Sequence, residues 1–333
     1  MQNAALVNRT SSSRPALRLV PTVDLSRQDW LDVRKSGLGS SDAASAVGLN
    51  PYKSQLELWL EKTGQGAGLP ALDVQDDTHP TYWGTLLEPI VAAAYTKRTG
   101  LRVRRVNAVL QHPQHPWMLA NVDRAVVGSD EVQLLECKTC GLNGAKLWRE
   151  GVPEYVQLQV QHQLAVTGKR AADVAVLVCG NELRVHRIER DDELIARLIE
   201  LEAQFWRLVE TRTEPPADGS ESAGHALQAL YPQDSGATVD LRSDAQLSQA
   251  FAQLLTARNE LTQAQEREAL LKQRIQQAMG EATRALFDAG EVSWKRSRDA
   301  SVVDVARLQK ERPDWAAPYF TTKPGSRRFT VQS

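Results

Sequence analysis

Two strand-like segments joined by a short polar turn constrain the fold of this chain more than any other stretch. Residues 122–127 and 132–138 are rich in valine and leucine, and Gly-Ser-Asp at 128–130 has the small polar residues of a tight turn. The pattern predicts a β-hairpin across residues 121–140.

Three ionisable residues of this hairpin are expected to lie close together. Side chains alternate along a strand, so Glu136 and Lys138 share one face and Cys137 takes the other. Asp123 lies on the opposing strand, where pairing can bring it level with Glu136. Two adjacent carboxylates repel each other unless a cation lies between them, and hard oxygen ligands suit Mg²⁺ or Mn²⁺. With a lysine to position or deprotonate water, the set predicts metal-assisted phosphodiester hydrolysis. Ordinary charges on an exposed hairpin are the alternative.

Composition narrows the class of protein. A chain of 333 residues predicts two domains, or one large domain with an appendage. The net charge of −1 does not favour nucleic acid as a partner, so a DNA site must be a local basic patch. Three cysteines, an odd number, argue against a disulfide framework and suit a cytoplasmic location. No apolar run approaches the length of a membrane span.

A glycine- and serine-rich loop at residues 36–42 precedes a short predicted helix at 43–47. Ser41 or Asp42 can cap that helix. A helix N-terminus that follows such a loop can hold a phosphate group. Capping alone is the alternative.

Further helices are predicted at residues 82–99, 154–167 and 191–211, and strands at 171–179 and 182–189. Glu88 lies on the first of these helices, where a glutamate is usually solvated unless other ligands lie near it. The second helix carries four glutamines: Gln157, Gln159, Gln161 and Gln163. Gln159 and Gln163 share a face, as do Gln157 and Gln161. They predict contacts with a DNA backbone or, more simply, a polar surface.

The composition changes after residue 214. Residues 215–240 predict a linker and 243–289 a long helix, for which Gly280 and Gly290 are the expected stops. Leu247, Leu254 and Leu261 follow a seven-residue register that Glu268 interrupts, which indicates a short or imperfect coiled coil. Residues 295–333 contain nine Lys/Arg against four Asp/Glu, with aromatic residues among them. Such a tail can bind nucleic acid, and a solvated basic face explains it equally well.

The cysteines offer a second kind of chemistry. Cys137-Lys-Thr-Cys140 matches a redox motif, but that motif belongs at a helix N-terminus and here it ends a strand. A zinc site needs more ligands than Cys179 and His162 readily supply. No Walker-type motif is present, which argues against an ATPase.

Several motifs, in order, resemble those of the YqaJ-type viral recombinase exonucleases, which are relatives of lambda exonuclease in the PD-(D/E)xK nuclease superfamily. These motifs are Arg34 with Gly-Leu-Gly-Ser-Ser41-Asp, Leu49-Asn-Pro-Tyr52, Trp83-Gly-Thr-Leu-Leu-Glu88-Pro, Pro116-Trp-Met-Leu-Ala-Asn-Val-Asp123, Leu135-Glu136-Cys-Lys138-Thr and Gln159-Val-Gln161. The resemblance covers roughly residues 28–212. Asp123 follows Val122, where the superfamily pattern has a proline.

The resemblance implies an α/β (α+β) fold with a central mixed β-sheet flanked by helices, the restriction-endonuclease-like core. A long C-terminal helix and a small basic tail extend it. We expect four segments: a disordered N-terminal arm (1–25), an exonuclease domain (26–214), a linker (215–240) and a C-terminal helical or coiled-coil region (241–333). A transit peptide is the second interpretation of the arm.

The resemblance also implies the ligands of two Mg²⁺ ions, for which Mn²⁺ can substitute. Asp123 bridges the two ions, Glu136 and the carbonyl of Cys137 complete one site, and Glu88 helps to hold the second. Lys138 positions the attacking water.

The remaining implied roles concern DNA. Arg34 and Ser41 bind the terminal 5′-phosphate, while Gln159 and Gln161 contact the DNA backbone or support the site.

The function implied is Mg²⁺-dependent 5′→3′ digestion of linear double-stranded DNA in a bacterial or phage-infected cell. The 3′ overhang passes to a single-strand annealing protein, and the chain forms a homo-oligomer, with a ring among the possibilities. An endonuclease or a nuclease of other polarity on the same fold is one alternative. A non-catalytic DNA-binding or assembly protein is the other.

Overall fold

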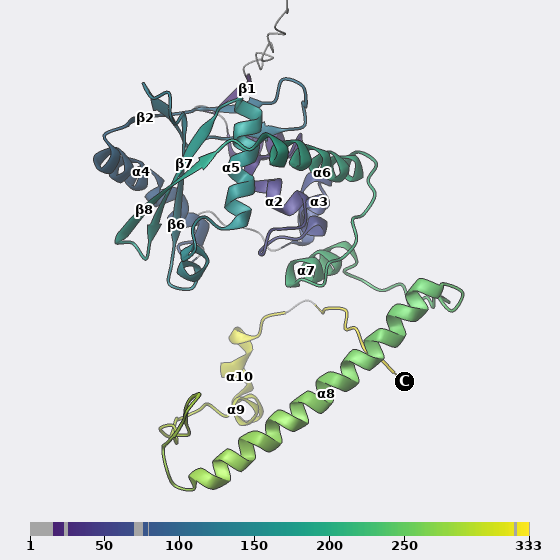
Figure 1. Cartoon of the computed structure of the whole chain (residues 1–333). Coiled ribbons are helices and arrows are strands. Elements are labelled where there is room, and N and C mark those ends of the chain that lie inside the picture. Colours follow the sequence, from purple (N-terminus) through teal and green to yellow (C-terminus); the bar gives the residue numbers. More distant parts are fainter. Residues whose placement is uncertain (1–15, 23–25, 70–75, 79, 323–324, 333) are drawn as a thin grey trace, which may run out of the picture. The chain divides into compact units, whose positions relative to one another are not determined.

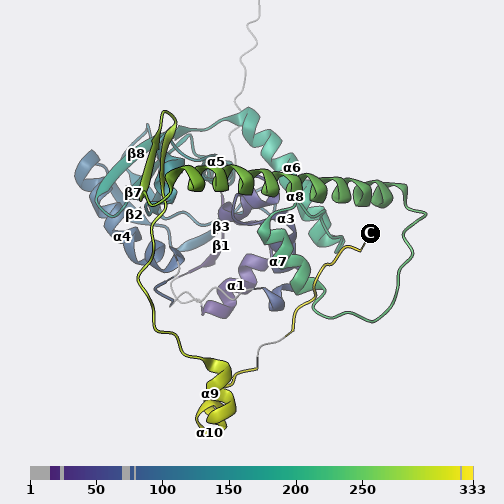
Figure 2. The same ribbon diagram turned by 90° about the horizontal axis from the view of Figure 1, so that it is seen from below.

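The computed structural model describes residues 16–22, 26–69, 76–78, 80–322 and 325–332. The chain divides into two compact units (Figures 1 and 2). The N-terminal unit comprises Met1–Gln233 together with Arg327–Ser333, and the C-terminal unit comprises Asp234–Ser326.

A five-stranded sheet in the order β2-β5-β6-β7-β8 forms the centre of the N-terminal unit. Its strands are β2 (Arg102–Arg105), β5 (Arg124–Val127), β6 (Leu134–Cys140), β7 (Ala171–Val178) and β8 (Glu182–Glu189). β6 and β7 run parallel and the other neighbouring strands run antiparallel, so the sheet is mixed. The predicted fold class is therefore confirmed.

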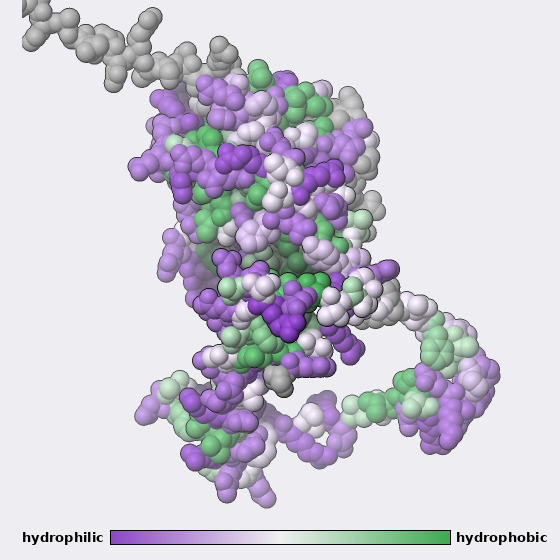
Figure 3. Space-filling model, turned by 90° about the vertical axis from the view of Figure 1, so that its right-hand side faces the viewer, coloured by the Kyte–Doolittle hydropathy of each residue, from purple (hydrophilic) through white to green (hydrophobic). Residues whose placement is uncertain are grey.

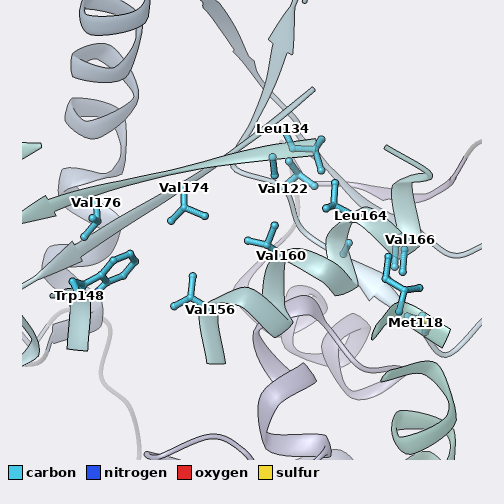
Figure 4. Close-up of a cluster of buried hydrophobic side chains, with 14 of the residues drawn as sticks. Met118, Val122, Leu134, Trp148, Val156, Val160, Leu164, Val166, Val174 and Val176 are labelled. Atoms are coloured by element: carbon cyan, nitrogen blue, oxygen red, sulfur yellow. The ribbon is translucent and has the colours of Figure 1, made fainter. Parts of the chain in front are cut away.

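Helices α4 (Pro80–Thr99) and α5 (Glu154–Thr167) cover opposite faces of this sheet. Alternate residues of β7 separate the two cores. Val174 and Val176 pack with Val160 of α5 (Figure 4), whereas Ala175 packs with Tyr95 of α4. A strand buried on both faces is rich in apolar residues, and β7 fits this pattern except at Asp173.

A second helical layer packs around Trp59, whose indole nitrogen donates to the carbonyl of Leu208 at 3.0 Å. The other helices of this unit are α1 (Arg27–Lys35), α2 (Ala43–Ala46), α3 (Gln55–Thr63), α6 (Asp192–Glu210) and α7 (Glu221–Leu230). A small sheet in the order β1-β3-β4 consists of β1 (Leu17–Pro21), β3 (Ala108–Gln111) and β4 (Leu119–Ala120). Hydrophilic residues are spread over the face of the unit seen in Figure 3, as expected for a surface outside these cores.

Two segment predictions need correction. The predicted linker contains α7, which Ser220 caps and which buries Ala223 and Ala226, the latter against the α3 core. Small residues three apart gave a weak helical signal beside the Pro- and Gly-rich flanks. The predicted disordered arm contains β1, which pairs with β3; residues 1–15 and 23–25 lie outside the described part.

The C-terminal unit is built on α8 (Ala245–Met279), a single long helix. The helix ends at Met279, at the first of its two expected stops, because Gly280 leaves the helical conformation with φ 52°; residues 281–289 do not continue it. β9 (Arg284–Phe287) and β10 (Gly290–Ser293) then form a hairpin, followed by α9 (Val305–Glu311) and α10 (Pro313–Ala316). None of the described helices of either unit is both long and apolar enough to span a membrane.

Candidate active site

The register between β5 and β6 brings Asp123 and Glu136 together. Arg124 pairs with Leu135 in an antiparallel register. Asp123, which precedes Arg124, therefore lies beside Glu136, which follows Leu135. The backbone N–H of Cys137 donates to Oδ2 of Asp123 at 2.8 Å, which fixes that carboxylate against the next strand. The hairpin predicted from the sequence therefore gathers the two acids as expected.

Glu136 is buried and held by three donors. Lys138 donates to its Oε1 at 2.8 Å, and Gln159 of α5 donates to the same oxygen at 2.6 Å. Gln163, one turn further along α5, donates to Oε2 at 2.7 Å and to the carbonyl of Asn121 at 3.1 Å. Lys138 also donates to Oε1 of Gln159 at 2.8 Å. The carboxylate, the ammonium and the two amides form one fixed network.

Burial and the neighbouring charges shift the pKa values of the ionisable groups in this network. Burial, reinforced by the neighbouring Glu136 carboxylate, raises the pKa of Asp123 to about 8. Burial alone would lower the pKa of Lys138, but Glu136 outweighs it and the net shift is upward. Lys138 is therefore an ammonium in this arrangement, suited to orient a water rather than to deprotonate it.

Glu88 lies beside this network, but its carboxylate forms ion pairs with two arginines rather than contacting Asp123 or Glu136. Its Oε1 accepts a hydrogen bond from Arg124 and lies 4.0 Å from Arg105. Arg124 is buried and also donates to the carbonyl of Asp123 at 2.7 Å. The arginine thus links the helix that carries Glu88 to the strand that carries Asp123.

The donor set fits a divalent cation at one position. Asp123, Glu136 and the Cys137 backbone offer hard oxygen atoms, and burial together with the neighbouring Glu136 carboxylate disfavours a second negative charge that a divalent cation would stabilise. Within the described residues, no three Asp, Glu, His or Cys side chains already converge as a metal centre. The side chain of Glu88 would have to leave Arg124 to serve a second ion.

A second cluster surrounds the glycine- and serine-rich loop. Asp42 accepts from Arg34 at 3.0 Å and from Lys62 of α3 at 2.6 Å. Arg34 also donates to Oγ of Ser41 at 3.2 Å. Burial would raise the pKa of Asp42, but Lys62 and Arg34 outweigh it and hold the pKa well below its usual range. Arg34 thus contacts both the Asp42 carboxylate and the hydroxyl of the exposed Ser41.

His162 of α5 joins this helix to α6 and to β4. Its ring is fully buried, with Nδ1 donating to Glu202 of α6 at 2.8 Å and Nε2 donating to the carbonyl of Leu119 at 2.9 Å. Burial lowers the pKa of His162, but Glu202 outweighs it and raises the pKa overall. Because Leu119 is close in sequence to Asp123, the hydrogen bond to its carbonyl also holds the segment that leads into the hairpin.

Gln161 does not face the acidic network. Its amide donates to the carbonyl of Glu189 at 2.8 Å and accepts from the backbone N–H of Asp191 at 3.1 Å. Residues four apart share a helix face, so Gln163, not Gln161, joins Gln159 at Glu136. The predicted role of Gln161 at the site is replaced by a structural one, joining α5 to the turn between β8 and α6.

Replacing Gln161 by leucine should therefore cost stability. The substitution removes both hydrogen bonds of the buried Gln161 amide, which lowers the free energy of unfolding by about 1–3 kcal/mol. Denaturant unfolding monitored by tryptophan fluorescence measures the change. Gln157→Leu is the matched control: its exposed amide bonds the Val152 carbonyl, where water can replace it, so stability should fall by less than about 0.5 kcal/mol. Equal stability of the two variants would contradict this role for Gln161.

Two comparisons with known proteins identify the family to which this chain belongs. The family model of the YqaJ-like viral recombinase domain matches residues 29–170. The uncharacterized protein YqaJ of Bacillus subtilis (strain 168) is 36% identical over 308 residues, which cover 91% of this chain and 93% of that protein. The chain belongs to the YqaJ-like viral recombinase family. The matched domain contains both the Asp123–Glu136–Lys138 network and the loop around Ser41.

Solved structures with partial similarity to this YqaJ-like chain also exist. An alkaline exonuclease, LHK-Exo from Laribacter hongkongensis, is 24% identical with a TM-score of 0.47, covering 56% of this chain and 93% of that one. A phage-related exonuclease from Haemophilus somnus 129PT is 12% identical with a TM-score of 0.38, covering 55% and 97%.

Proposed function

We propose that this YqaJ-like chain is a metal-dependent exonuclease that degrades linear double-stranded DNA from the 5′ end. The observation that carries the proposal is the pair of acids, the half-buried Asp123 and the buried Glu136, held together beside the ammonium of Lys138. This combination serves hydrolysis of a phosphodiester, whose leaving and attacking oxygens both need positive charge nearby.

Asp123, Glu136 and the carbonyl of Cys137 would hold Mg²⁺, with Mn²⁺ as a substitute, and Glu88 would contribute to a second ion. When bound, the metal supplies positive charge that stabilises the negative charge developing on the phosphate. Arg124 keeps Glu88 next to the hairpin, so this carboxylate is close to where it would serve.

The chain's own residues orient the reactants. Lys138 lies between Glu136 and Gln159, so its remaining ammonium hydrogen is available to a water at the phosphate. Gln159 and Gln163 hold Glu136 at both oxygens, which fixes its direction without adding charge. These contacts prepare the site before the DNA arrives.

The second cluster supports the choice of DNA end. Arg34 and Ser41 would bind the 5′-phosphate, and Lys62 holds the Asp42 carboxylate that orients Arg34. Lys62 was missed in the sequence because it lies on α3, far along the chain from the loop. Transfer of the 3′ strand to an annealing protein, and a ring of subunits around DNA, stay predictions.

Arg34→Ala and Ser41→Ala should reduce the preference for a phosphorylated end. The ratio of degradation rates on 5′-phosphate and 5′-hydroxyl duplexes should fall about 10- to 100-fold for Arg34→Ala, because a charge-assisted hydrogen bond contributes about 1.5–3 kcal/mol. Ser41→Ala should have a smaller effect in the same direction. Strand-specific labels on the two duplexes measure both rates.

Arg197→Ala, an exposed arginine on α6, is the control and should leave the ratio unchanged. Loss of activity on both ends equally would assign Arg34 to stability or general DNA binding. An unchanged ratio in both variants would remove the phosphate site from the proposal.

A further inference from the structure

Helix α8 is a single unbroken helix (Figures 1 and 2), and it exposes leucines along its length. Leu247, Leu261 and Leu271 retain 47%, 58% and 52% of their accessible surface. A helix draws most of its stability from packing of an apolar face, so 35 residues with exposed leucines call for a partner.

The sequence of α8 follows a heptad repeat that Glu268 interrupts. The a positions are Leu247, Leu254, Leu261, Glu268 and Ile275, and the d positions are Ala250, Ala257, Ala264, Leu271 and Ala278. Large residues thus dominate one row and alanine the other. Two such helices pack closely when the large row of each faces the small row of its partner, as it does when the helices run antiparallel.

We propose that α8 pairs with α8 of a second copy of this chain as an antiparallel two-stranded coiled coil. With the two helices in full overlap, every a residue meets a d residue of the partner subunit. The layers are Leu247 with Ala278, Ala250 with Ile275, Leu254 with Leu271, Ala257 with Glu268, and Leu261 with Ala264.

Charges favour this orientation. In the antiparallel register, Glu260 lies across from Arg267 of the partner subunit, and the two-fold symmetry makes this pair twice. Glu268, the interruption in the a row, faces the small side chain of Ala257 and lies level with Arg258 of the partner subunit. The acidic residue that breaks the leucine register therefore has both space and a cation.

Parallel pairing would bring like charges together. Glu268 would face its own copy in the core of the coiled coil, and Arg267 would lie across from Lys272 of the partner subunit on both sides. Both contacts are repulsive, so the same sequence that fits the antiparallel pair opposes the parallel one.

Glu260 and Arg267 have no oppositely charged residue three or four positions away on their own helix. By contrast, Lys272 lies 4.0 Å from Glu268 one turn before it. A partner helix gives Glu260 and Arg267 the pairing that their own helix does not supply.

The antiparallel pairing also sets the separation of the two helix starts. The Ala245 ends of the two α8 helices lie at opposite ends of the pair, about 50 Å apart at 1.5 Å per residue.

A charge exchange in the full-length chain tests the interface. Glu260→Arg and Arg267→Glu, each alone, should weaken self-association about tenfold, since two attractive contacts become repulsive. The double variant should restore the affinity to within about threefold. Sedimentation equilibrium measures the association, and Glu266→Arg, which faces away from the seam, is the matched control. Absence of rescue would overturn the pairing, because Glu260 and Arg267 are too far apart on one helix to compensate each other.

The orientation is tested with a photo-crosslinking amino acid in place of Phe251. In the antiparallel pair, position 251 lies beside Lys272 of the partner subunit, so crosslinked peptides should join residue 251 to the end of α8. A crosslink from 251 to its own copy would establish the parallel arrangement and contradict the proposal. A crosslink to another part of the same chain would show that α8 packs within one subunit, and would equally overturn it.

Discussion

Asp123→Asn is expected to lower the rate of DNA hydrolysis about 10³-fold or more. Asparagine preserves the acceptor for the Cys137 N–H but removes the charge that a divalent cation requires. Metal assistance contributes several kcal/mol to such reactions, and each 1.4 kcal/mol is a factor of ten. Single-turnover digestion of linear duplex DNA measures the rate, and isothermal calorimetry should show weaker Mg²⁺ or Mn²⁺ binding.

The same substitution should stabilise the metal-free protein. Burial and Glu136 raise the pKa of Asp123 to about 8, so ionising this carboxyl opposes folding. Between about pH 4 and pH 8 the unfolded carboxyl is ionised while the folded one keeps its proton, so the wild-type chain loses stability as the pH rises. The variant does not lose stability in this way. The difference between its melting temperature and that of the wild type should therefore increase as the pH rises across that window.

Asp130→Asn, in the exposed turn of the same hairpin, provides the control and should change neither rate nor stability. If Asp123→Asn retained full activity, Asp123 would not be a metal ligand. Because an unfolded variant would also be inactive, the melting temperature is measured for every variant whose rate is measured.

Lys138→Met should lower hydrolysis about 10²- to 10³-fold while leaving metal binding in place. Methionine fills a similar volume without the ammonium, and Glu136 keeps its bonds from Gln159 and Gln163. The loss is that of one positioned donor in the transition state, and it should appear in kcat more than in KM. Lys146→Met, an exposed lysine, is the control.

Calorimetry separates the role of Lys138 from that of the carboxylates. Mg²⁺ affinity equal to or greater than that of the wild type is expected, since a competing positive charge has been removed. If Lys138→Met abolished metal uptake as well, the lysine would support the metal site rather than the water.

The sequence predicted the acidic network because its members are close in the chain. Strand alternation alone places Glu136 and Lys138 on one face, and a short turn limits the register that brings Asp123 beside them. Glu88 was a ligand only by resemblance, and the structure shows it beside the hairpin but held by Arg124. No local pattern distinguishes that arginine from a surface charge.

Long-range contacts were not predictable from local patterns. Lys62 reaches Asp42 from another helix, and only the packing of α3 brings the two within 2.6 Å. The choice between Gln161 and Gln163 depended on which face of α5 meets the sheet. Helical periodicity grouped Gln159 with Gln163 but could not orient the pair. α7 was concealed by a flanking composition typical of linkers, and its burial against α3 is what forms it.

One measurement tests the central claim most directly. The purified chain and its Lys138→Met variant are given Mg²⁺ and a linear duplex with a 5′-phosphate at one end only, each strand carrying a different label, beside a covalently closed circle and a chelator control. We predict that the phosphorylated strand disappears from its 5′ end, that the opposite strand remains, and that the circle, the chelated reaction and the variant show no loss. Cleavage of the circle would make the protein an endonuclease. Absence of cleavage with both Mg²⁺ and Mn²⁺ would contradict the proposed catalytic role of Asp123, Glu136 and Lys138.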